Sequence, residues 1–91
     1  MALNKLERSN KAHIRLAHHY DDVQRKTKMS NPKSFWAYVK SNYHHIIYAR
    51  QNNSNKLITK NDKRELYKSL VRSCADDTKK FKGAYVPNKF R

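Results

Sequence analysis

The side chains best suited to chemistry in this sequence are lysines and arginines that recur at helical spacing. Arg8, Lys11 and Arg15 are three and four residues apart, so they project from one side of an α-helix. A row of cations favours the binding of phosphate groups in a polyanion. We expect these three to contact phosphates, and we extend the candidate nucleic-acid-binding surface to Arg25, Lys26, Lys28, Lys33, Lys40, Arg64, Lys68 and Arg72.

Tyr38 is the aromatic residue that we expect to stack on an unpaired base. It lies between Lys33 and Lys40 in the sequence, off the apolar stripe to which Trp36 and Tyr43 belong. Stacking of a base on an aromatic side chain contributes about 1–3 kcal/mol. We place Trp36 and Tyr43 in the core and add Tyr38 to the candidate nucleic-acid-binding residues.

Three motifs resemble catalytic or metal sites but lack the partners that such sites need. The pair Asp76–Asp77 has no third carboxylate evident for a two-metal centre. The adjacent histidines of His18–His19 and of His44–His45 point in different directions on a helix, and none has a cysteine or histidine at zinc-finger spacing. Cys74 lies on an apolar face, where we expect a small buried side chain. We therefore predict no enzyme, no catalytic residue, no metal and no cofactor.

Three amphipathic helices are predicted to position the candidate residues, at about 2–28, 32–50 and 62–82. One glycine and two prolines in 91 residues favour helices over short strands. The first helix is expected to bury a stripe at steps of three and four, formed by Ala2, Leu6, Ser9, His13, Leu16, Tyr20 and Val23. The fold class that follows is all-α, a small helical bundle or hairpin.

The predicted ends of these helices come from capping residues. Asn31 before Pro32 is a good helix start, and Asp62 with Glu65 three residues later is typical of a capping box. The polar stretch 51–56 predicts a loop. Gly83 is expected to end the third helix, so that 84–91 forms an extended basic tail.

Length and charge restrict the remaining possibilities. The chain has 91 residues, which predicts one small domain over 1–91, and a formal net charge of +14. It has no apolar run of the length that a membrane span or a secretory signal needs. Its single cysteine cannot form an internal disulfide, which favours an intracellular location. A charge this lopsided favours a polyanionic partner.

Residues 31–41, Asn-Pro-Lys-Ser-Phe-Trp-Ala-Tyr-Val-Lys-Ser, resemble a motif of non-LTR retrotransposon polyproteins. The similarity extends over about residues 10–71 and includes Leu57-Ile58-Thr59 followed by Lys63, Glu65 and Leu66. This region is similar to the linker between the endonuclease and the reverse transcriptase core of those polyproteins. The resemblance implies a helical segment that touches template nucleic acid and carries no catalytic group.

The sequence leaves three functions open. The first is a nucleic-acid-binding module, with RNA favoured over DNA as the partner. The second is a structural subunit of a large ribonucleoprotein assembly, in the manner of a ribosomal protein. The third is a small basic protein that binds an acidic protein surface, which would need an apolar hot spot more than a uniform basic row.

Overall fold

Three helices account for nearly all of the described chain in the computed structural model, which describes residues 4–28 and 31–75. They are α1 (Lys5–Arg25), α2 (Pro32–Ser54) and α3 (Lys60–Ala75). The predicted all-α class is confirmed. The part of helix three predicted beyond residue 75, Gly83 and the tail at 84–91 lie outside the described residues.

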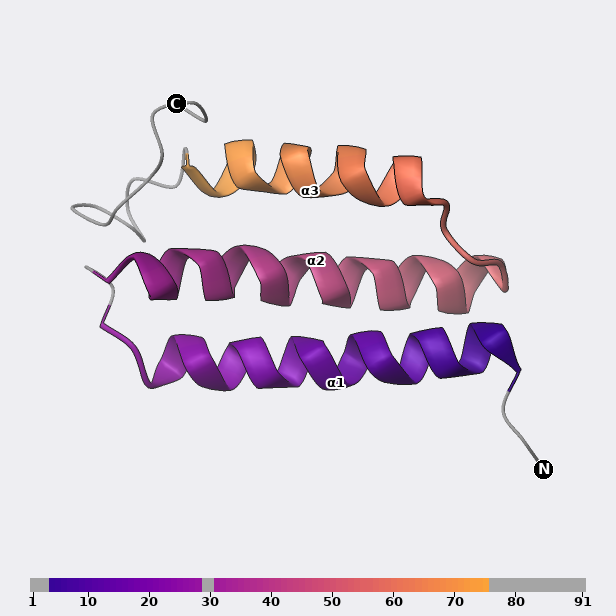
Figure 1. Cartoon of the computed structure of the whole chain (residues 1–91), viewed down its shortest axis with the longest axis horizontal. Helices are drawn as coiled ribbons and strands as arrows, with labels where there is room; N and C mark the ends of the chain where they lie inside the picture. Colours follow the sequence, from indigo (N-terminus) through magenta and orange to yellow (C-terminus); the bar gives the residue numbers. More distant parts are fainter. Residues whose placement is uncertain (1–3, 29–30, 76–91) are drawn as a thin grey trace.

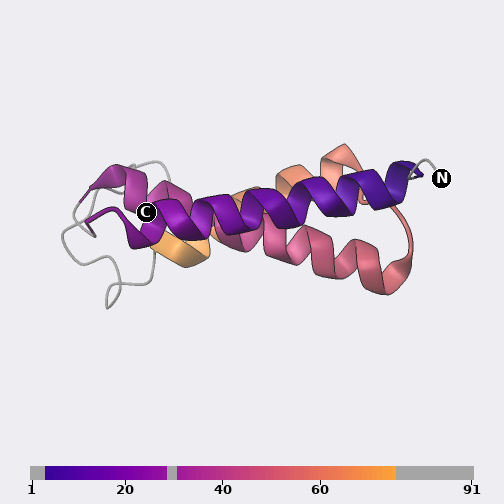
Figure 2. The same ribbon diagram turned by 90° about the horizontal axis from the view of Figure 1, so that it is seen from below.

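Helix α2 lies in the middle, and α1 and α3 lie along its two sides (Figure 1). Each helix runs antiparallel to the one before it. Seen from below, the three axes cross at shallow angles (Figure 2). Because α1 and α3 both pack on α2, the central helix presents two remaining sides on which side chains of all three helices can meet.

Capping side chains explain where α1 and α2 begin. The Asn31 side chain accepts a hydrogen bond from the backbone N–H of Lys33, and Pro32 occupies the first helical position, as predicted. Helix α1 begins at Lys5 rather than Ala2 because Asn4 is its cap, accepting from the backbone N–H of Glu7 at 2.8 Å.

The predicted boundaries between α2 and α3 are wrong on both sides. Helix α2 continues through the polar stretch to Ser54, because Gln51 is fully buried and hydrogen-bonded, and it ends at Asn55 in the left-handed conformation (φ 59°). Helix α3 begins at Lys60. Thr59, not Asp62, supplies the cap, since its hydroxyl accepts from the backbone N–H of Asp62.

The two interfaces of α2 bury different kinds of side chain. Against α3, a cluster of Phe35, Val39, Val71 and Cys74 is buried, with Cys74 5% exposed as predicted. Against α1, the interface contains buried Ala17 on α1, and Gln51 of α2 donates hydrogen bonds to Ser9 and Asn10. Of the stripe predicted on α1, Ala2 lies outside the described residues, and Leu6, Ser9, His13, Tyr20 and Val23 are partly buried as expected. Leu16 is 38% exposed, because Ala17 occupies the inward position.

Candidate nucleic-acid interface

The cations predicted along α1 lie on its outer surface. Arg8, Lys11 and Arg15 are exposed and take part in none of the ion pairs among the described residues. Asp22 interrupts the row, because it pairs with Arg25 at 3.1 Å and with Lys26 at 3.0 Å. Three unpaired positive charges therefore remain available to a polyanion on this surface.

A first groove lies between α1 and α2 and has a volume of about 250 Å³. Its lining combines aromatic and apolar side chains with two lysines: His19, Tyr20, Val23, Lys33, Trp36, Ala37 and Lys40. The Nζ of Lys40 lies 5.3 Å from the centre of the Tyr20 ring, so the two helices are joined here by a cation–π contact.

A second groove, of about 520 Å³, lies between α2 and α3. It is lined by two tyrosines and four cations: Tyr43, Lys60, Lys63, Arg64, Tyr67 and Lys68. The Tyr43 and Tyr67 rings meet edge to face with centres 5.4 Å apart. Burial raises the pKa of Tyr43. Burial, followed by the neighbouring phenols of Tyr20 and Tyr43, also raises the pKa of Tyr67. Both phenols therefore stay neutral and can donate hydrogen bonds.

Both grooves open on the same side of α2. Trp36, Lys40 and Tyr43 follow one another at steps of four and three, which places them on one side of a helix. Nζ of Lys63 on α3 lies 3.5 Å from Nε2 of His13 on α1, so the outer helices also approach each other here. We call this surface the cation–aromatic face and define it as Tyr20, Lys33, Trp36, Lys40, Tyr43, Lys60, Lys63, Arg64, Tyr67 and Lys68.

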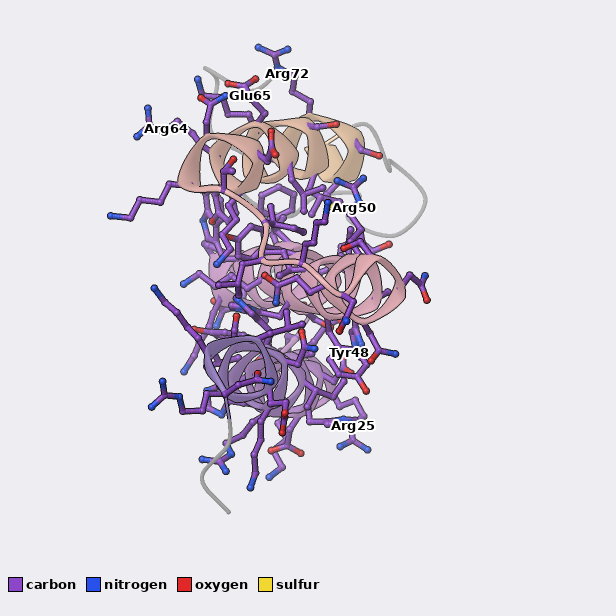
Figure 3. All side chains as sticks on the ribbon, turned by 90° about the vertical axis from the view of Figure 1, so that its right-hand side faces the viewer. Arg25, Tyr48, Arg50, Arg64, Glu65 and Arg72 are labelled. Carbon is purple, nitrogen blue, oxygen red and sulfur yellow. The ribbon has the colours of Figure 1, made fainter. Side chains whose placement is uncertain are left out.

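Among residues 4–28 and 31–75, no carboxylate lines either groove of the cation–aromatic face. On α3 the charges are divided between two sides, because Asp62 and Glu65 line a different groove with Arg50. Arg64 and Arg25 point to opposite sides of the helix layer (Figure 3), and Arg25 lines a polar groove with His18, Asp21 and Gln24. Apart from Lys68, which pairs with Glu65 at 3.9 Å, the cations of the cation–aromatic face have no carboxylate partner among the described residues, so the face presents a net positive charge.

Tyr38, the predicted stacking residue, lies on the other side of α2. It lies on the same side of the helix as Asn42 and His45, one turn before Asn42, whose side chain donates to the Tyr38 backbone carbonyl. Its ring is half-buried against the cluster of Phe35 and Val39. The structure thus separates Tyr38 from the aromatic residues that line the two grooves.

The structure brings only part of the predicted site together. Lys33, Lys40, Arg64 and Lys68 lie on the cation–aromatic face. Arg25 and Lys26 are engaged by Asp22, whereas Lys28 and Arg72 are exposed outside both grooves. The predicted residues therefore do not form one surface: some lie on the outer side of α1 and some on the cation–aromatic face, and Tyr38, Lys28 and Arg72 lie outside both grooves.

Sequence reasoning missed Lys60, Lys63, Tyr20 and Tyr67 as parts of this face. Lys60, Arg64 and Lys68 recur at steps of four, a signal that a helix starting at Lys60 would have revealed. The two tyrosines fit the apolar stripes of their helices. A half-buried tyrosine at the edge of such a stripe both packs and lines a groove, and periodicity alone does not separate the two roles.

A cluster of Ser41, Asp21 and His45 has the residue types of a hydrolase triad but a different order. The carboxylate of Asp21 accepts from the Ser41 hydroxyl and lies 3.1 Å from His45 Nε2. In a triad the histidine stands between the other two and takes the proton of the nucleophile. Here the hydroxyl proton is directed at the carboxylate, so the cluster joins α1 to α2.

Across residues 4–28 and 31–75, no three histidine, cysteine or acidic side chains are grouped to hold a metal ion. Asp76–Asp77 lies outside the described residues. Within the same ranges, no helix has the length and apolar character to cross a membrane. Comparisons with protein-family models, curated proteins and solved structures give no match.

Proposed function

We propose that this chain is a non-catalytic nucleic-acid-binding module that takes up an unpaired strand, RNA in preference to DNA, on its cation–aromatic face. The observation that carries the proposal is the combination of groove-lining aromatic rings with Lys33, Lys40, Lys60, Lys63, Arg64 and Lys68, while none of the described carboxylates lines a groove. The resemblance of residues 10–71 to a retrotransposon linker supports the same class of partner.

Two complementary interactions contribute to the binding of an unpaired strand. Lysines and arginines that neutralise phosphates release condensed counterions, which supplies affinity for any polynucleotide. Aromatic rings in a groove favour unpaired bases, because the base faces of a duplex are already stacked on one another. RNA is favoured because sequence-reading RNA proteins mostly bind exposed bases in loops and single strands.

The outer row of Arg8, Lys11 and Arg15 has a secondary role in this proposal. Its three residues are exposed on the helix surface and line neither of the two aromatic grooves. We expect it to add sequence-independent attraction and to speed encounter, since long-range charge mainly raises association rates.

The test compares two triple variants of the whole chain. Lys33→Gln/Lys60→Gln/Arg64→Gln removes three exposed cations from the cation–aromatic face. Arg8→Gln/Lys11→Gln/Arg15→Gln removes three exposed cations from the outer side of α1 and serves as the matched control. None of the six takes part in an ion pair among the described residues, so each triple lowers the +14 charge equally without leaving a carboxylate unpaired.

Binding of a single-stranded RNA, the same DNA sequence and a duplex of equal length is measured by fluorescence anisotropy over a range of salt. We expect the single strand to bind best and the face variant to lower the salt slope by about two, at about 0.7 for each phosphate that is no longer neutralised. The control should change the slope less. Equal effects of both triples contradict the assignment of the site.

Failure to bind any polynucleotide at low salt contradicts the function itself. Retention of an acidic protein by a chain that ignores nucleic acid would then favour the third function, binding of an acidic protein surface.

A further inference from the structure

Three helices each contribute one side chain to a chain of polar contacts at the centre of the molecule. His13 of α1 and His44 of α2 have their Nδ1 atoms 2.8 Å apart. On the far side of the His13 ring, Nε2 lies 3.5 Å from Nζ of Lys63 on α3. No other hydrogen-bonded contact among the described residues joins the bodies of all three helices.

The donors and acceptors in this chain have one consistent arrangement. Lysine Nζ carries only donors, so Nε2 of His13 accepts. The neutral His13 ring then bears its proton on Nδ1 and donates to Nδ1 of His44, which must be unprotonated. Both histidines are therefore neutral when the chain of hydrogen bonds is complete.

A second proton on either ring breaks this arrangement. Protonation of His13 at Nε2 sets its new N–H against the N–H donors of Lys63. Protonation of His44 at Nδ1 sets its new N–H against that of His13. Because the two Nδ1 atoms are only 2.8 Å apart, two N–H groups cannot both occupy the space between them.

Within the described part of the chain, no carboxylate acts on either ring to stabilise its protonated form. On α1, Tyr20 stacks on His44 with ring centres 5.9 Å apart. On α2, Tyr43 meets His44 edge to face, and Lys40 and His45 act on it electrostatically. On α3, the acting charge is Lys63. The nearby carboxylate of Asp21 is engaged by Ser41 and His45.

We propose that Lys63, His13 and His44 form a proton-sensitive latch that holds the three helices together near neutral pH and releases them on acidification. The latch stands on this geometry and does not depend on the proposed binding of nucleic acid. It is a conformational device built into the helix junction.

The direction of the pKa shifts agrees with the geometry. Burial, followed by the charges of His13, Lys40, Lys63 and His45, lowers the pKa of His44 to about 4 from 6.5. Burial and then Lys63 lower the pKa of His13. Between pH 6.5 and about 4 the unfolded chain binds more protons than the folded one, so stability falls as the pH falls through this window.

The experiment measures urea unfolding of the whole chain by circular dichroism from pH 7.5 to pH 4.5. For the wild type we expect stability to fall with a slope that corresponds to about one to two protons taken up on unfolding. His44→Gln replaces the imidazole with an amide that does not titrate, and we expect it to remove about one proton from that slope.

His19→Gln is the matched control, because His19 is exposed on α1 and makes none of the latch contacts. It should keep the wild-type slope. If His44→Gln folds and keeps that slope as well, the latch is refuted.

A measurement on the wild type covers the case in which His44→Gln fails to fold. Histidine ring signals are followed by NMR as the pH is lowered. We expect His44 to stay neutral to well below pH 6.5 and the helix-junction signals to change together when it titrates. Titration of His44 near 6.5 with the folded spectrum intact overturns the proposal.

Discussion

The two interfaces of α2 differ in what holds them. The contact with α3 is built on Phe35, Val39, Val71 and Cys74, which are excluded from water and make no demand on the direction of a partner. The contact with α1 joins Gln51 to Ser9 and Asn10, and Asp21 to Ser41 and His45. The first interface relies on apolar burial, whereas the second combines the burial of Ala17 with oriented polar groups.

This difference explains why a chain with so few large apolar residues still has a defined arrangement. Apolar burial stabilises in proportion to area and tolerates small slips between helices. A hydrogen bond with a buried partner fails when the register changes, because the partner is then left unsatisfied. We infer that apolar burial is the main source of stability in the α2–α3 interface and that the polar contacts of the α1–α2 interface set its register.

The largest effect should come from truncating the apolar interface. Phe35 is fully buried at the centre of its cluster, so Phe35→Ala removes packing and leaves a cavity, at a cost of about 3–5 kcal/mol. A domain of this size has little stability in reserve, and we expect loss of the cooperative transition in urea. Leu57→Ala is the control, since Leu57 is 41% exposed. A cooperative transition in Phe35→Ala at the wild-type midpoint contradicts the assignment.

A smaller loss should follow from removing the polar centre of the other interface. Gln51 is fully buried, donates to Ser9 and Asn10, and accepts from the backbone N–H of Ile58 at 3.0 Å. Gln51→Leu keeps much of the volume but leaves these three groups without a partner, which we expect to cost about 1–3 kcal/mol.

The urea midpoint checks this prediction, and Asn52→Leu on the exposed neighbouring position is the comparison. If both variants lose the same stability, the hydrogen bonds of Gln51 do not set the interface.

Acid should weaken the α1–α2 interface in a second stage below the range of the histidine latch. Burial tends to raise the pKa of Asp21, but hydrogen bonds from Ser41 and His45 and the charges of His45 and His18 outweigh it, so the pKa is lowered from 3.8. A carboxylate whose pKa is lower in the folded state stabilises the fold when the pH is above its pKa in the unfolded chain. That contribution disappears as the pH falls through its pKa in the folded chain.

Asp21→Asn should therefore flatten the pH dependence of stability below about pH 4 and leave the dependence above pH 5 in place. Unfolding in urea at pH 3 to 6 measures it. Glu7→Gln is the comparison, because Glu7 is exposed on α1 and takes part in none of the ion pairs among the described residues. A loss of slope in the histidine range instead would mean that the two clusters titrate as one unit.

The sequence was sufficient to predict that the chain forms three helices, but not which side chains meet between them. Asn31 with Pro32 predicted the start of α2 because a cap is a local feature. The end of α2 could not be predicted, because Gln51 becomes helical through partners on α1 and before α3. His13 was visible as an irregular position on an apolar stripe. Its pairing with His44 depends on the relative register of two helices, which no spacing within one helix reveals.

The smallest and sharpest comparison uses two serines on α2, Ser34 and Ser41. Both are buried, at 0% and 4% exposure, but the Ser41 hydroxyl donates to Asp21, whereas Oγ of Ser34 has no hydrogen-bond partner among the described residues. Ser41→Ala should cost about 1–2 kcal/mol, because it removes a bond to a charged group. Ser34→Ala should be neutral or stabilise by up to about 1 kcal/mol, since it removes an unsatisfied polar atom. The two urea midpoints should move in different directions or by clearly unequal amounts. Equal losses would show that the packing of small side chains, and not the hydrogen bonding of their hydroxyls, determines stability at these positions.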